Sequence, residues 1–153
     1  MVMQSLAPML IAARDNGYAV AQFNVDTVEI AQAVLAVAEN LRSPVILALG
    51  QGVDRVGRMD AVAAGVRQLA QAAAVPVCLH LDHSESFPQI ARAIRLGFTG
   101  IMMDASAHPL AQNIAETRMV VALCSQLGVG VEAELGRIAG VEDNLSNSQA
   151  PPR

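Results

Sequence analysis

The sequence predicts an α/β protein built on a parallel β-sheet, and three observations support this fold class. Short apolar segments alternate along the chain with longer segments of helical periodicity, at roughly 25–30 residues per unit. The connections between these segments are short, as in consecutive β/α units. The apolar segments end in polar residues or glycine, at the edge of a parallel sheet where ligands bind in such folds.

The five expected strands are apolar runs, most of them rich in β-branched residues and too short for a helical period. In chain order they cover residues 18–25, 45–49, 75–83, 99–106 and 129–136. Their carboxyl ends carry Asn24, Gly50, Asp82 with His83, Asp104, and Glu132 with Glu134. Polar residues scattered through a core would not keep to one end of every strand. The repetition therefore predicts a functional site at the carboxyl edge of the sheet.

The expected helices are recognised by their start and stop residues. They begin at Ser5, Asp26, Asp60, Ser86 and His108-Pro109, and they end near Asn16, Ser43-Pro44, Ala73, Gly97 and Gly128. Asp26 and Glu29 have the spacing of a capping box. Ser86 and Gln89 have the same spacing, and Pro88 falls in a first turn, where its missing N–H does no harm.

Apolar residues at helical spacing mark the helix faces that we expect to be buried. In the second helix these are Ile30, Val34, Val37, Ala38 and Leu41, and in the third they are Val62, Val66, Leu69 and Ala73. In the last two helices they are Ile90, Ala93, Ile94 and Leu96, and then Leu110, Ile114, Val121 and Leu127.

The composition is that of a globular protein. The 153 residues are 53% hydrophobic and 16% charged, with a net charge of −4 and scattered basic residues. This balance excludes a disordered chain and gives no basic surface for nucleic acid. No apolar run approaches the ~20 residues that span a bilayer, and the start of the chain lacks the features of a signal peptide. Cys78 and Cys124 lie in apolar segments and are expected to be reduced, which favours a cytoplasmic protein.

Two architectures fit this order of elements. A (β/α)8 barrel needs eight β/α units and typically ~250 residues, of which this chain would supply the first five. An open, doubly wound sheet is the alternative for a complete domain, but the chain has no G-x-G-x-x-G turn of the dinucleotide-binding kind. We expect residues 1–143 to belong to one domain and residues 144–153 to form a polar tail or a truncated catalytic loop.

The last strand suggests a metal site. Strand alternation places Glu132 and Glu134 on one face, where two carboxylates repel each other unless a cation, a proton or a basic group lies between them. His83 and an acid of a neighbouring strand would complete a set of donors suited to zinc or a similar divalent ion. The alternative is a hydrated edge lined by Glu132 and Glu134 without a metal.

The chain resembles the N-terminal part of the class II, metal-dependent fructose-bisphosphate and tagatose-bisphosphate aldolases. The motifs that carry the resemblance are A-Q-F-N-V at 21–25, H-L-D-H at 80–83, I-M-M-D-A-S at 101–106 and V-E-A-E-L-G-R-I-A-G-V-E-D at 131–143. The resemblance implies a (β/α)8 TIM barrel of which about the first five units are present.

The resemblance also implies catalytic and substrate-binding roles. Asp82 would polarise or protonate the aldehyde oxygen, and Glu142, on a mobile loop, would remove the proton from the ketone phosphate. Asn24 would hold the enediolate or the substrate. The backbone at Gly50 would bind phosphate, where fructose-bisphosphate members of the family commonly have a serine.

The implied cofactor is Zn²⁺. His83 would bind the catalytic ion, and Asp104 and Glu134 would hold a second or displaced metal position for a divalent or a monovalent cation. The family uses two further zinc histidines, and His80 and His108 do not occupy positions that could replace them. We therefore expect little or no activity from the isolated chain.

The resemblance predicts that the whole protein cleaves a ketose 1,6-bisphosphate to dihydroxyacetone phosphate and glyceraldehyde 3-phosphate. The sequence does not distinguish the fructose from the tagatose substrate. A homo-oligomer with a phosphorylated sugar substrate, and without nucleic acid or membrane partners, is expected. The alternatives are a non-catalytic assembly or regulatory subunit, and another metal-dependent barrel enzyme such as a hydrolase.

Overall fold

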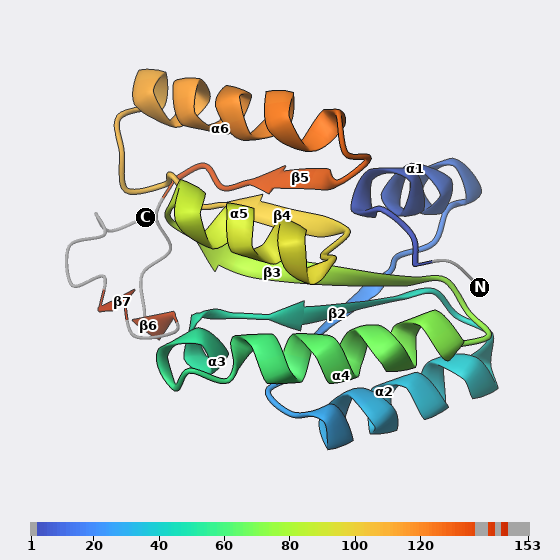
Figure 1. The fold of residues 1–153 in the computed structure, drawn as a ribbon. Coiled ribbons are helices and arrows are strands. Elements are labelled where there is room, and N and C mark those ends of the chain that lie inside the picture. Colours follow the sequence, from blue (N-terminus) through green and yellow to red (C-terminus); the bar gives the residue numbers. More distant parts are fainter. Residues whose placement is uncertain (1–2, 137–140, 143–144, 147–153) are drawn as a thin grey trace.

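The computed structural model describes residues 3–136, 141–142 and 145–146, and its main strands form one parallel sheet (Figure 1). The strands are β1 (Ala21–Asn24), β2 (Val45–Leu49), β3 (Val77–Ser84), β4 (Gly100–Met103) and β5 (Gly130–Ala133). They pair in the order β1-β2-β3-β4-β5, which follows the chain. A doubly wound sheet reverses its strand order at a switch point, whereas a barrel does not. The predicted segment of a TIM barrel is confirmed.

Helices precede and connect the strands. They are α1 (Leu6–Asn16), α2 (Val28–Leu41), α3 (Gln51–Arg55), α4 (Met59–Ala72), α5 (Phe87–Leu96) and α6 (Leu110–Ser125). None of these described helices is long and apolar enough to cross a membrane. A short antiparallel pair, β6 (Val141–Glu142) with β7 (Leu145–Ser146), lies where the sequence predicted a loop and a polar tail. The other residues of 144–153 lie outside the described part of the chain.

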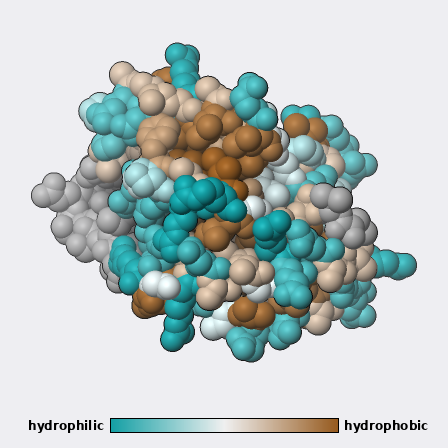
Figure 2. Space-filling view, in the orientation of Figure 1, coloured by the Kyte–Doolittle hydropathy of each residue, from teal (hydrophilic) through white to brown (hydrophobic). Residues whose placement is uncertain are grey.

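One predicted helix face is wrong, and another is wrong in part. In α2 the predicted Ala38 is buried and Val34 packs against the core, but Ile30, Val37 and Leu41 are exposed, and Ala31 and Leu35 are buried in their place. In the last helical segment the predicted Leu110, Ile114, Val121 and Leu127 are all exposed, and Asn113, Val120 and Cys124 are buried. Both helices carry apolar residues on more than one side, so periodicity does not select the packed face. Figure 2 shows hydrophobic residues gathered in the region of α6 and β5.

Helix starts also differ from the prediction. Thr27, and not Asp26, is the N-cap of α2, because its Oγ1 accepts a hydrogen bond from a backbone N–H of the first turn. Asp60 lies in the first turn of α4, after the N-cap residue Arg58, and its carboxylate accepts a hydrogen bond from Arg92. The single-turn helix α3 was not predicted, since its five residues are too few to show a period.

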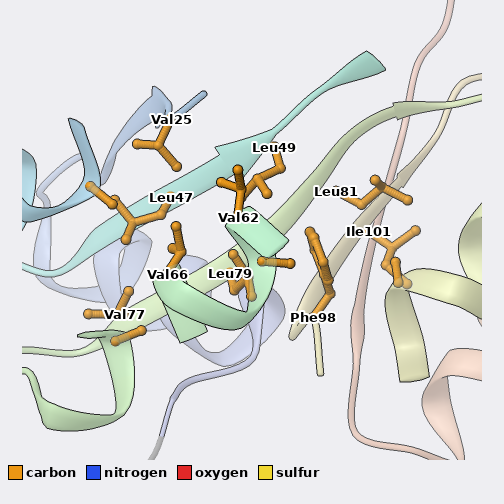
Figure 3. Packing of buried hydrophobic residues seen from close by; sticks show 14 of the residues in the cluster. Val25, Leu47, Leu49, Val62, Val66, Val77, Leu79, Leu81, Phe98 and Ile101 are labelled. Carbon is orange, nitrogen blue, oxygen red and sulfur yellow. The ribbon is translucent and has the colours of Figure 1, made fainter. Parts of the chain in front are cut away.

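Strand alternation divides the core between two faces of the sheet. Odd-numbered residues such as Leu47 and Leu79 pack in the main core with Val62 and Val66 of α4 (Figure 3). The even-numbered Ile46 and Cys78 face the other way and pack against α1. We call this second side, which faces α1, the inner face. Because α1 covers its amino end, the polar residues at the carboxyl edge are the part of the inner face left for a site.

Cys78 and Cys124 are free and buried, in agreement with the predicted reduced state. Burial raises the pKa of the Cys78 thiol to about 11. A thiol with so high a pKa is almost entirely protonated at neutral pH, so Cys78 acts as a small apolar core residue.

Two glycines allow α1 to approach the inner face. A Cβ atom at Gly130 would lie 2.7 Å from Leu6 Cβ and 2.8 Å from the backbone nitrogen of Ala7. A Cβ atom at Gly100 would lie 3.1 Å from Leu6 Cβ of α1, as well as 2.7 Å from His80 Cδ2. The clash at Gly130 involves backbone, which cannot turn aside as the end of a side chain can.

We predict that Gly130→Ala lowers the free energy of unfolding by about 1–3 kcal/mol, because overpacking against α1 forces the helix to shift. Gly52→Ala is the matched control, since no atom lies within 4 Å of its Cβ and alanine is preferred in helices. Denaturant unfolding followed by circular dichroism measures both variants. Equal stability of the two variants would contradict the close packing of α1.

Candidate functional site

β3 contains a bulge where it reaches the carboxyl edge. Its pairing with β4 is regular through Leu81 and resumes at Ser84 with a shifted register. Asp82 and His83 therefore lie opposite a single residue of β4, Met102, which is the arrangement of a β-bulge. The backbone of His83 is left-handed, with φ of +49°. This region of φ is uncommon for a residue other than glycine and is a common mark of functional sites.

The bulge changes where His83 points. In a regular strand Asp82 and His83 would point to opposite faces, and the odd-numbered His83 would face the outer helices. The structure instead brings both side chains to the inner carboxyl edge. Asp82 Oδ2 accepts a hydrogen bond from Asn24 Nδ2 at 3.2 Å, and His83 Nδ1 lies 3.0 Å from Asp104 Oδ2. Asn24, Asp82 and Asp104 thus lie at the same edge of the sheet, as predicted, and the bulge places the side chain of His83 beside them.

Strand register explains the acidic part of the site. Met102 of β4 lies beside Glu132 of β5. Two residues after each of them, Asp104 and Glu134 come close to each other. His83 Nδ1 lies 3.0 Å from Asp104 Oδ2 and 3.5 Å from Glu134 Oε2.

One donor atom from each of His83, Asp104 and Glu134 lies within 4.8 Å of the others. Their side chains are only 22%, 8% and 15% exposed, respectively. One imidazole nitrogen and two carboxylate oxygens, brought together and partly removed from water, fit a divalent cation such as zinc.

Charges at the site shift two pKa values. Burial by itself lowers the pKa of His83, but the hydrogen bond with Asp104 and the carboxylates of Asp82 and Glu134 outweigh burial and raise this pKa. Burial raises the pKa of Asp104, yet hydrogen bonds from Ser106 and His83 outweigh it and lower this pKa. Both shifts favour the charged imidazolium–carboxylate pair in the metal-free protein.

A second histidine lies deeper on the inner face. The fully buried His80 places Nε2 3.1 Å from Glu132 Oε2. Within the described residues neither ring nitrogen of His80 completes a hydrogen bond of good geometry. The His80 ring lowers the pKa of Glu132 by more than burial raises it. The third histidine, His108, does not belong to the group of possible metal donors found among the described residues, and its Nδ1 lies 3.0 Å from Glu116 Oε2 on α6.

Two predicted residues remain to be placed. Gly50 is buried at the N-cap of α3, directly after β2 at the carboxyl edge. Glu142 belongs by its backbone to β6, and its side chain lies outside the described part of the chain. Sequence reasoning missed Gln51, whose Nε2 donates a hydrogen bond to the carbonyl oxygen of His83 at 2.5 Å. The only signal for it was a polar residue between two glycines after a buried strand.

The His83–Asp104 pair predicts a pH-dependent stability in metal-free protein. Because the pKa of His83 is raised, the protonated ring stabilises the folded state. This contribution to the free energy of unfolding is complete below pH 6.5, the ordinary pKa of histidine, and is lost as the pH rises through the pKa of His83 in the folded protein. Because the pKa of Asp104 is lowered, its ionised carboxylate also stabilises the folded state. This contribution to the free energy of unfolding is complete above pH 3.8 and is lost as the pH falls through the pKa of Asp104 in the folded protein. We predict that His83→Gln costs most stability between pH 3.8 and 6.5.

Urea unfolding of chelator-treated wild type and His83→Gln across the pH range measures this difference. A stability difference that does not change with pH would show that the pair contributes nothing as charges.

Comparison with known proteins gives consistent matches. Residues 4–151 match the family model described as "Fructose-bisphosphate aldolase class-II". A Bacillus subtilis (strain 168) protein named "Probable fructose-bisphosphate aldolase" is 46% identical over 148 residues, which are 95% of this chain and 52% of that protein. A fructose-bisphosphate aldolase of Thermus caldophilus is 45% identical over 138 residues, 90% of this chain and 45% of that one.

A solved structure agrees with these sequence matches. The YdjI aldolase from Escherichia coli K12 superposes with a TM-score of 0.84 at 35% identity, covering 88% of this chain and 51% of that chain. The chain thus spans about half the length of the curated relatives that it matches.

Proposed function

Because the chain belongs to the class II fructose-bisphosphate aldolase family, we propose that the protein acts as a metal-dependent ketose-bisphosphate aldolase. The reaction is the reversible cleavage of fructose or tagatose 1,6-bisphosphate to dihydroxyacetone phosphate and glyceraldehyde 3-phosphate. The observation that carries the proposal is the convergence of His83, Asp104 and Glu134 beside Asp82 at the carboxyl edge.

We propose Zn²⁺ as the cation, in a family that is generally metal-dependent. His83 would hold it, and Asp104 and Glu134 would hold it or a second divalent or monovalent cation nearby. When bound, the ion would withdraw electron density from the oxygens of the ketone phosphate and so acidify the adjacent C–H.

The acids of the chain would move the protons. In the cleavage direction the C4 hydroxyl loses its proton as the C3–C4 bond breaks, and C3 gains a proton. Asp82, which is 7% exposed and oriented by Asn24, would take the hydroxyl proton and return it to the aldehyde oxygen in the reverse direction. We assign to Glu142 the proton at C3. Asn24 would also bind the substrate, and the backbone at Gly50 would bind its phosphate.

The described surface supports a homo-oligomer. Large apolar side chains of α6 are exposed, namely Leu110, Ile114, Met119, Val121 and Leu123. A phosphorylated sugar is the proposed substrate. The free, buried cysteines support a reducing compartment, the cytoplasm, as the location.

We predict that His83→Gln and Asp82→Ala separate metal binding from catalysis. His83→Gln removes a donor, so the Zn²⁺ dissociation constant should rise at least about tenfold, whereas His108→Gln, at an exposed position, should leave it unchanged. Asp82→Ala should lower the cleavage rate by about 10²–10⁴ while retaining Zn²⁺, because it removes a proton-transfer group. Calorimetry and a coupled cleavage assay of the native gene product measure the two effects. Full activity of Asp82→Ala after thorough chelation would refute the proposal.

We predict little or no cleavage by the purified 153-residue chain. It holds a single histidine at the metal group, and it spans about half of its curated relatives. The assay uses fructose 1,6-bisphosphate with added Zn²⁺, and a full-length family member serves as the positive control. Turnover comparable to that of the control would show that the site is complete within these residues.

A further inference from the structure

We propose that Gln51 is a positioning residue that holds the bulge of β3 and thereby directs His83 into the metal site. The inference rests on the proposed function, since it concerns the same site. Among the described residues, the side chain of Gln51 forms hydrogen bonds with the backbone of His83 and with Gln89, and not with the donor atoms of the site, so it would act through the backbone of His83. Its Nε2 donates to the carbonyl oxygen of His83 at 2.5 Å, and both residues are partly buried.

The bulge creates a need for this donor. A bulge leaves its extra residue outside the ladder of the sheet, and a buried carbonyl without a partner costs about 1–3 kcal/mol. β2, which would otherwise offer backbone N–H groups along this side of β3, ends its pairing at Leu49, opposite Leu81. The chain then turns at Gly50 into α3, whose first residue is Gln51. The side chain of Gln51 thus continues the hydrogen bonding of β2 at the point where the strand has ended.

A line of hydrogen bonds fixes which end of the Gln51 amide faces His83. Gln51 Oε1 accepts from Gln89 Nε2 at 3.1 Å, and Gln89 Oε1 in turn accepts from Ser86 Oγ at 3.2 Å and from the backbone N–H of Glu85 at 3.1 Å. Each acceptor is occupied by a donor from the next group, so the NH₂ end of Gln51 is left to face His83. Turning the amide over would place oxygen against oxygen and NH₂ against NH₂.

The helix that carries Gln51 is itself anchored. Asp54 of α3 accepts a hydrogen bond from Arg92 Nη1 of α5 at 2.5 Å, and the Nε of Arg92 donates to Asp60 of α4 at 2.8 Å. The guanidinium group of Arg92 therefore joins α5 to α3 and to α4. Because α3 has only five residues, this anchor fixes the backbone from which the Gln51 side chain reaches His83.

The other side of the bulge is held by a different residue. Ser84 Oγ donates to the carbonyl oxygen of Met102, and the carbonyl oxygen of Ser84 accepts from the backbone N–H of Asp104 at 2.8 Å. These bonds fasten β3 to β4 after the bulge but leave the left-handed residue itself free to relax. Gln51 contacts that residue directly, so its loss should let His83 return toward extended backbone and move Nδ1 away from Asp104 and Glu134.

The test measures metal binding with Co²⁺ alone, whose visible absorption reports its coordination. Gln51→Met removes the donor and keeps the length of the side chain, which matters because the cavity beside Gln51 holds only about 10 Å³ and a smaller residue could admit water. Gln51→Ala is the second variant. Gln71→Met, on the exposed side of α4, is the control for the same chemical change.

We expect the Co²⁺ dissociation constant of Gln51→Met to rise about 10–100-fold, the range for residues that orient a metal ligand, while Gln71→Met matches the wild type. Gln51→Ala should give a change of the same direction. A residue with only a structural role would lower the unfolding temperature and leave the dissociation constant unchanged. Unchanged Co²⁺ affinity in both folded Gln51 variants would overturn the inference.

Nitrogen-15 NMR of the histidine side chains detects the contact between His83 and Asp104 in the metal-free protein. In the wild type, the contact of His83 Nδ1 with Asp104 should give the ring nitrogens distinct chemical shifts and favour one tautomer. In Gln51→Met the chemical shifts and the tautomer populations should move toward those of a free histidine side chain. If the wild-type chain binds no Co²⁺, the proposed metal site fails, and the NMR comparison still decides the role of Gln51. An unchanged His83 spectrum in Gln51→Met would then contradict it.

Discussion

The site depends on one backbone irregularity, the left-handed His83 in the bulge of β3. The acids of the group, Asp82, Asp104 and Glu134, stand at even-numbered positions and face inward by ordinary strand alternation. Their shared charge needs a cation or a positively charged partner. His83 stands at an odd-numbered position, and only the bulge brings its ring to Asp104 and Glu134. Without the bulge, the imidazole of His83 would not lie among the carboxylates at the carboxyl edge.

The rest of the fold confines the site to this edge. The outer helices bury the odd-numbered residues in the main core, and α1 closes the amino end of the inner face against Gly100 and Gly130. His80 and Glu132 fill the layer between α1 and the site. The strand order places Asn24 and Glu134 on opposite edges of one curved segment, with Asp82 and His83 at its centre.

Much of this arrangement could be predicted from the sequence, and the failures have physical causes. Strand positions and polar strand ends follow from local composition, and the resemblance to the aldolases supplied the expected roles of Asp82 and His83. The bulge was not visible, because H-L-D-H reads equally well as a regular strand and nothing local sets a left-handed residue. Gln51 was missed because its partner lies 32 residues away. The predicted packed face of α6, and part of that of α2, were wrong because both helices carry apolar residues on more than one side.

We infer that the bulge carries His83 to a cation site shared with Asp104 and Glu134. The most direct measurement is a crystal structure of the chain soaked in Zn²⁺, with anomalous scattering recorded at the zinc edge. We predict an anomalous peak within coordination distance of His83 Nδ1 and of at least one of the carboxylates of Asp104 and Glu134, with φ of His83 positive. An extended His83 whose ring faces the outer helices, with zinc bound elsewhere, would contradict it.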